Sequence, residues 1–356
     1  MNVILYIIAV ICLCMLVVLM TMYIALYRAK VKNQKKKRQK QEWIRQHKAL
    51  IDNLLETGEI HQDIIPKTVF DFEVLEEELV RRIKKDDTLL KWIHSFIRMY
   101  FLDHYRKRLR HSKPSVRVNS LFYIEYFQLV ELQEEVLSLL KKKQLLKQEK
   151  YQIYMTLASF SYRGMLDILL SGKENLPVFV RRRILETVLN ESTIPLVIGE
   201  FHRYPLAIRE SILDVLREKH VRSAEFLSLL EELLQDSAIM SESHHMELRV
   251  RIWKALAAFG YFPNIDFILH AIPNAKREPE RIMLARVMGS IRQEEFIPFL
   301  EEMLADSSYL VRNEAAHSIS KYRNGINHLR RVVTFHPDRF ARDIAAEWLE
   351  RGLYDY

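Results

Sequence analysis

Apolar residues along most of the chain recur at the spacing of one face of an α-helix. From about residue 111 onward, a basic residue is followed by apolar or small residues three, four and seven positions later, as in the segment from Leu310 to Ile319. Residues at these spacings share one helix face, whereas a half-buried strand alternates with a period of two. The pattern therefore predicts an all-α protein.

This pattern repeats at a near-constant interval. The basic residues that anchor its copies are separated by 33, 31, 28, 40, 32, 31 and 30 residues, and they are Arg117, Lys150, Arg181, Arg209, Arg249, Arg281, Arg312 and Arg342. A second, shorter apolar stretch lies between anchors, as in residues 226–234 and 296–304. Each unit is thus expected to be a helical hairpin that buries its apolar faces by stacking on its neighbours.

One unit carries a resemblance to a known family. The run from Leu300 to Ala316 resembles a HEAT repeat, in the short bacterial form shared with phycobilisome-lyase-type repeats, and the resemblance extends over residues 111–352. It implies a HEAT-like α-α superhelix (solenoid) of about eight units over residues 111–356. Asp306 and Arg312 match the paired Asp and Arg that tie adjacent inner helices in that family. The resemblance implies the same inter-repeat structural role for the other arginine anchors, namely Arg117, Arg209, Arg249, Arg281 and Arg342, although the other units lack the Asp.

The N-terminus predicts a membrane anchor over residues 1–27. The segment from Val3 to Leu26 has no charged residue, and it is long enough as a helix, about 36 Å, to cross a hydrocarbon layer of about 30 Å. No basic residue precedes this segment and no small-residue cleavage pattern ends it, so we expect one uncleaved N-terminal transmembrane helix. The basic residues that follow place the N-terminus outside a cell membrane and the C-terminal domain in the cytoplasm.

The basic pI comes from a linker predicted over residues 28–68. Its part from residue 28 to residue 50 holds ten basic residues and one acidic residue, so the rest of the chain has a net charge close to −1. A nucleic-acid-binding domain carries its positive charge on the folded part, so no nucleic-acid partner is expected. The linker either binds anionic inner-leaflet lipids or acts only as a topology signal. Its membrane-surface candidates are Lys35, Lys36, Lys37, Arg38 and Lys40.

Two further helices are predicted between the linker and the repeats, over residues 69–83 and 88–109, within a helical N-terminal cap spanning residues 69–110. The second helix combines aromatic residues such as Trp92 and Phe96 with a basic end. Such a helix either covers the core of the first repeat or lies on the membrane surface.

Residues able to carry catalysis are not apparent. The two cysteines, Cys12 and Cys14, lie in the apolar N-terminal segment, so no disulfide or cysteine zinc site is available to the rest of the chain. The sequence contains no P-loop, nucleophile elbow, H-E-x-x-H motif or EF-hand loop. His244 and His245 are the only adjacent pair among 13 histidines. We therefore expect no catalytic residue, no metal site and no cofactor.

Two features suggest binding instead. Arg181, Arg182 and Arg183 cannot all face one neighbouring helix, so at least one is expected to reach an acidic partner. The interval of 40 residues between anchors marks an insertion at residues 236–245, which is either a binding edge or a surface loop.

The sequence thus predicts a membrane-tethered scaffold or adaptor that binds a protein partner. The resemblance to HEAT-repeat proteins implies that such an anchored chain serves as an accessory subunit of a membrane-bound complex, for example one that makes envelope polysaccharide. A HEAT-like enzyme of the bilin-lyase type and a membrane-surface lipid-binding domain remain as alternatives.

Overall fold

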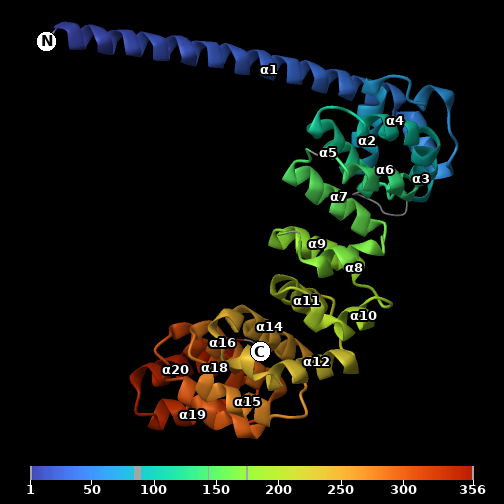
Figure 1. Ribbon diagram of the computed structural model, residues 1–356. Coiled ribbons are helices and arrows are strands. Elements are labelled where there is room, and N and C mark those ends of the chain that lie inside the picture. Colours follow the sequence, from blue (N-terminus) through green and yellow to red (C-terminus); the bar gives the residue numbers. More distant parts are fainter. Residues whose placement is uncertain (1, 84–89, 143, 174, 355–356) are drawn as a thin grey trace. The chain divides into compact units, whose positions relative to one another are not determined.

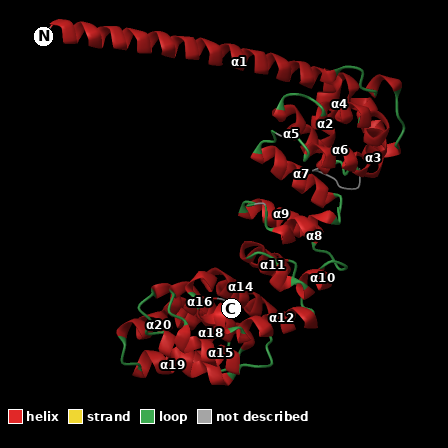
Figure 2. Cartoon of the chain, viewed as in Figure 1, coloured by secondary structure: helices red, strands yellow, loops and turns green. Residues whose placement is uncertain are grey.

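The computed structural model describes residues 2–83, 90–142, 144–173 and 175–354. These residues form α-helices, short 3-10 helices and connecting loops, and no strand occurs among them (Figure 2). The prediction of an all-α protein is confirmed. The chain divides into two compact units, residues 1–156 and 157–356.

The first unit begins with one very long helix, seen in blue in Figure 1, and continues with shorter helices packed around its C-terminal end. Its elements are α1 (Asn2–Thr57), η1 (Gln62–Ile64), α2 (Val69–Ile83), α3 (Leu90–Tyr100), α4 (Leu102–Leu109), α5 (Pro114–Tyr126), η3 (Val130–Leu132), α6 (Gln133–Leu139) and α7 (Lys147–Ser159), the last of which crosses into the second unit.

The second unit contains longer helices that pack in series, each on the next, with shorter helices between them: α9 packs on α11, α11 on α14, α14 on α16, α16 on α18 and α18 on α20. Its elements are α8 (Gly164–Ser171), α9 (Val178–Val188), α10 (Ile194–Gly199), η4 (Phe201–Arg203), α11 (Leu206–Glu218), α12 (Ala224–Gln235), α13 (Ser237–Ser241), η5 (Ser243–His245), α14 (Met246–Phe259), α15 (Asp266–Ala271), η6 (Ile272–Asn274), α16 (Glu278–Ile291), η7 (Glu294–Phe296), α17 (Ile297–Met303), α18 (Tyr309–Ser320), α19 (Gly325–Phe335) and α20 (Arg339–Tyr354).

The repeated pattern coincides with helix starts. All eight anchor residues are the fourth residue of their helix, in α5, α7, α9, α11, α14, α16, α18 and α20. The residues three positions after the anchors are all buried, and so are those seven positions after them, except for the half-buried Leu349. The sequence pattern therefore located both the start and the buried face of these helices.

Helix α1 differs from the expected division into an anchor and a linker. The helix runs without a break through the basic stretch to Thr57, because lysine, arginine and glutamine are good helix formers and no proline or glycine interrupts them. Ile51, Leu54 and Leu55 are buried, in the part of the chain where α1 packs on α2 and α3. The end of the predicted linker is thus part of the core of the first unit.

The predicted helix over residues 69–83 is observed as α2, whereas the helix predicted over residues 88–109 is divided at Phe101 into α3 and α4. Residues 84–89 lie outside the described part of the chain. The aromatic side of α3 and α4 is fully buried at Phe96, Phe101 and Tyr105. That side covers the core of the first unit and is not available to a membrane surface.

The described residues of α1 contain one stretch that is long and apolar enough to cross a membrane, by length and composition. Its described side chains are exposed, as an apolar helix surface would be before lipid surrounds it. This stretch is the structural counterpart of the predicted anchor.

Candidate functional site

The arginine anchors first bind the loop that precedes their own helix. The Nη1 atom of Arg117 donates to the carbonyl oxygens of His111 and Ser112, at 2.6 and 2.8 Å. The same kind of bond, from Nη1 to a main-chain carbonyl of the segment before the helix, is made by Arg181, Arg249, Arg281, Arg312 and Arg342. Fixing the anchor at the fourth helical position lets the guanidinium reach back over the first turn, so it satisfies loop carbonyls that would otherwise be unpaired.

Four anchors also bind a residue of the following helical repeat. Arg117 forms a buried ion pair with Glu149 of α7, in which Nη2 lies 2.7 Å from Oε2, and this bond raises the pKa of Arg117 above its usual value. Arg249 donates through Nε to Glu280 of α16 at 2.5 Å. The same role is played by Arg281 toward Asp306, at 2.6 and 3.1 Å, and by Arg181 toward the hydroxyl of Ser211, at 3.1 Å.

The other predicted inter-repeat arginines do not form such a side-chain hydrogen bond within the described residues. Arg312 binds the main chain of Asp306, whose carboxylate is taken by Arg281, and its guanidinium lies over the ring of Phe340 with 5.0 Å to the centroid. Among the residues that the structure describes, Arg342 donates to the carbonyls of His336 and Pro337 in its own loop. The buried Nε of Arg209 has no hydrogen-bond partner there. The carboxylate of Asp306, which the resemblance paired with Arg312, is therefore paired with Arg281 instead.

The arginine triplet is divided between structural and surface positions. Arg181 is buried and binds Ser211, and its burial lowers its pKa. Arg182 pairs with Glu218 of α11 at 2.5 Å. Only Arg183 is exposed. Of the three candidates for partner binding, Arg181 and Arg182 thus form contacts between α9 and α11.

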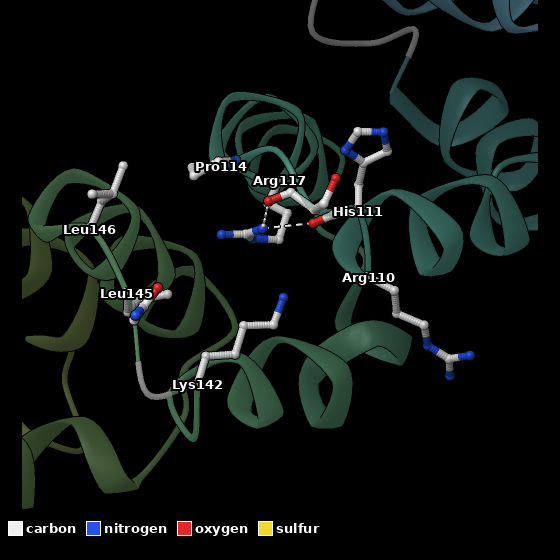
Figure 3. A pocket seen from close by; sticks show the side chains of 9 residues that line it. Arg110, His111, Pro114, Arg117, Lys142, Leu145 and Leu146 are labelled. Atoms are coloured by element: carbon white, nitrogen blue, oxygen red, sulfur yellow. Dashed lines mark hydrogen bonds between the residues drawn. The ribbon is translucent and has the colours of Figure 1, made fainter.

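A cavity of about 620 Å³ surrounds Arg117 in the first unit (Figure 3). It is lined by Arg110, His111, Ser112, Pro114, Arg117, Lys142, Gln144, Leu145 and Leu146, with no carboxylate among them. Figure 3 shows the Lys142 amine directed toward Arg117, whereas the guanidinium of Arg110 points away from it. Arg117 is already bound to Glu149 and to its loop carbonyls, so among the described lining residues Lys142 is the cation directed into this cavity.

A second cavity, of about 900 Å³, surrounds Arg249 in the second unit. It lies between the insertion helix α13, the starts of α14 and α16, and the segment formed by α15 and η6. Its walls are Leu234, Ser237, Met240, Ser241, Ser243, Met246, Arg249, Phe267, His270, Ala271, Asn274, Lys276, Arg277, Pro279 and Glu280. Both cavities therefore lie around an anchor arginine that binds a residue of the next helical repeat.

Two of the five lysine and arginine residues predicted to meet the membrane surface instead pair with α2. The amine of Lys36 lies 2.6 Å from a carboxylate oxygen of Glu73, and that of Lys40 lies 2.6 Å from one of Glu77. The bond from Lys36 contributes to a lowered pKa of Glu73 despite its partial burial. These pairs join the basic part of α1 to the folded part of the first unit.

The first unit also contains a buried titratable cluster between α2 and α4. A carboxylate oxygen of Glu76, which is 1% exposed, lies 3.8 Å from His104 Nε2, and the other lies 3.6 Å from Arg108. Burial raises the pKa of Glu76 to about 7, against the opposing effect of Arg108. Burial and Arg108 together lower the pKa of His104 to about 4, and the ring of Phe72 stacks on His104 at 3.9 Å. Sequence reasoning did not single out this cluster, because the residues lie on separate helices.

One group in the insertion is close enough to hold a metal ion. Ligand atoms of Glu242, His244 and His245 all lie within 4.8 Å of one another. Burial, His244 and Arg209 lower the pKa of His245, which favours its neutral, metal-binding form. The nearby Arg209 cation opposes binding of a divalent ion at the same place, so this exposed turn is a poor candidate for a structural metal site.

These sites present charged and apolar side chains. Within the described residues, we find no nucleophile held by a base and oriented by a third group, which would indicate a catalytic site. The chain matches no protein-family model and no curated protein sequence.

Proposed function

We propose that this protein is a membrane-tethered scaffold whose cytoplasmic part is a HEAT-like α-solenoid and whose partner is another protein. The series of helices from α9 to α20, with an anchor at the fourth residue of each, supports the solenoid, because in such folds each repeat contacts only its neighbours. The apolar part of α1 supports the tether. The basic residues that follow it support an orientation with the N-terminus outside and the folded part in the cytoplasm.

The observation that carries the protein-binding proposal is a set of exposed apolar side chains at the starts of the packed helices. Val178 and Phe179 in α9, Tyr309 and Leu310 in α18, and Phe340 in α20 are each half or more exposed. They lie two or three positions before an anchor, while the positions three residues after each anchor are buried. Large apolar side chains that recur in an exposed position at the start of successive helices are candidates for a protein interaction surface.

The tether favours partners that are themselves associated with the membrane. A protein held by α1 meets membrane-associated partners at a raised effective concentration. The basic segment of α1 contributes Lys35, Lys37 and Arg38 to attraction by anionic inner-leaflet lipids, at roughly 1 kcal/mol per residue near the surface. A membrane-bound complex, such as one that makes envelope polysaccharide, is the type of partner that we propose.

The experiment is affinity purification of the tagged full-length chain in a mild detergent, with partners identified by mass spectrometry. We expect a stoichiometric membrane-associated partner that is lost from a triple variant, Phe179→Ser, Leu310→Ser and Phe340→Ser. A matched variant, Arg323→Glu with Arg330→Glu, changes exposed residues elsewhere and should keep the partner. Purification of the chain alone, or with a bound chromophore, would contradict the scaffold proposal.

A further inference from the structure

The insertion between the anchors Arg209 and Arg249 is an ordered part of the second unit. Its helix α13 is capped by Asp236, whose carboxylate accepts hydrogen bonds from the amides of Ala238 and Ile239 at 2.9 and 3.2 Å. Ile239 is 2% exposed. The buried Arg249 donates to the carbonyl of Ile239 at 2.8 Å and to that of Glu242 at 2.7 Å. The insertion is therefore held against the repeats by an apolar contact and by an anchor arginine.

This insertion forms one wall of the cavity of about 900 Å³. The apolar lining comes from Met240 on α13, Met246 on α14, and Leu234, Phe267 and Ala271 on the neighbouring helices. A space of this size accommodates a ligand of several hundred Å³, and apolar walls with a few polar groups are typical of binding pockets. Methionine side chains are flexible and adapt to differently shaped apolar groups. The smaller cavity at Arg117 has no methionine or aromatic residue in its lining.

The residues that line the cavity carry a net positive charge. Lys276 and Arg277 are exposed at its edge, and the side chain of neither makes an ion pair with the described residues. Glu280 is the one carboxylate in the lining, and its charge is compensated by Arg249 at 2.5 Å. The cavity thus presents two available cations beside an apolar floor, which complements a ligand with carboxylates next to an apolar group.

We propose that this cavity binds an extended acidic segment of the partner protein, with a bulky apolar side chain between Met240, Met246 and Phe267. Carboxylates on either side of that apolar residue pair with Lys276 and Arg277. The inference rests on the proposed scaffold function and specifies the chemistry of the segment that is captured. It also gives the insertion a role, because the insertion forms the wall that closes a pocket between two successive helical repeats.

The test uses the full-length chain in an uncharged detergent and fluorescence anisotropy of labelled twelve-residue peptides. The first peptide has a central Leu-Phe pair flanked by glutamates, the second has lysines in place of the glutamates, and the third has two serines in place of the Leu-Phe pair. We expect saturable binding of the first peptide only. The double variant Lys276→Glu with Arg277→Glu, and the cavity-filling variant Ser241→Trp, should each weaken this binding at least tenfold.

The matched control is the double variant Arg323→Glu with Arg330→Glu, which makes the same charge change outside the cavity and should leave binding within twofold. Circular dichroism melting of each variant checks that it is folded. Absence of binding by the wild-type chain, or equal binding by Ser241→Trp, would overturn the inference. Equal binding of the serine peptide with displacement by inorganic phosphate would also overturn it, because a simple anion site would then explain the data. If the co-purified partner stays on the Ser241→Trp variant, the cavity inference fails while the scaffold proposal stands.

Discussion

The buried cluster of Glu76 and His104 predicts an unusual pH dependence of stability. The pKa of Glu76 is about 7 in the folded chain, against a usual value of 4.5, so the folded state holds this proton more tightly than the unfolded state. The stability that the folded chain gains from Glu76 is complete below pH 4.5 and is lost as the pH rises to 7. His104 behaves in the opposite way, because its folded-state pKa of about 4 lies below the usual 6.5. Its contribution is complete above pH 6.5 and is lost as the pH falls toward 4.

The two effects cover nearly the same pH range and have opposite signs. Each one-unit shift in pKa corresponds to about 1.4 kcal/mol, so the whole shift of each group corresponds to about 3 kcal/mol, of which about 2 kcal/mol falls between pH 4.5 and 6.5. In the wild-type chain, the contributions of Glu76 and His104 should nearly cancel over this range. Both shifts have burial as their largest cause, so removing one group should leave the shift of the other in place.

The perturbation is therefore Glu76→Gln, which removes one side of the balance. We expect its free energy of unfolding to fall by about 2 kcal/mol as the pH is lowered from 6.5 to 4.5, because His104 then titrates without the opposing effect of Glu76. The variant His104→Asn should show the reverse slope, losing stability as the pH rises. The double variant should again be insensitive to pH in this range.

The assay is urea unfolding of the full-length chain at several pH values in an uncharged detergent. Tryptophan fluorescence reports the first unit through Trp43 and Trp92 once Trp253 and Trp348 are replaced by Phe. The control is Glu77→Gln, next to Glu76 but exposed and paired with Lys40, and it should keep the wild-type pH profile. A Glu76→Gln profile as flat as that of the wild type would refute the reasoning.

Three further predictions concern packing and attachment to the membrane. Arg249→Met should lower the free energy of unfolding of the second unit by about 3–5 kcal/mol, since it leaves Glu280 buried without its cation. Urea unfolding followed by Trp253 fluorescence measures this loss. Adding Glu280→Gln to the Arg249→Met variant should recover part of it. Gly289→Ala should cost about 1–3 kcal/mol, because its methyl group would lie 2.4 Å from the Ser318 hydroxyl oxygen between α16 and α18, and an unchanged melting temperature would contradict this close packing. Deletion of residues 1–27 should move the chain from the membrane pellet to the soluble fraction after alkaline extraction, whereas a pellet that still contains the shortened chain would show that α1 is not the main attachment.

Local sequence was sufficient to predict the helices and many of their buried positions. The spacing of apolar residues reports which side of a helix faces the core, because that periodicity is a property of the helix itself. The same spacing located the anchors, which all occupy the fourth residue of a helix. The apolar composition of the first 26 residues likewise identified the candidate membrane segment, since a bilayer requires length and the absence of charge.

The partners of these residues could not be predicted from spacing. Arg117 pairs with Glu149 and Arg249 with Glu280, whereas Arg281 selects Asp306 from the loop before the next helix. The difference depends on which side chain reaches the guanidinium once two helices are packed. A sequence pattern contains no information on such a distance.

The basic stretch and the buried cluster show the same limit. The positive charge in the N-terminal part of the chain was evident from composition, but its pairing with Glu73 and Glu77 depends on how α1 packs on α2. The shifted pKa of Glu76 also arises only after folding removes its carboxylate from water. The sequence by itself determined the helical class, the repeat and the candidate membrane segment, which depend on local periodicity and composition. The tertiary structure alone decided the ion pairs, the cavities and the buried charges, because these depend on distances between residues that are remote in the chain.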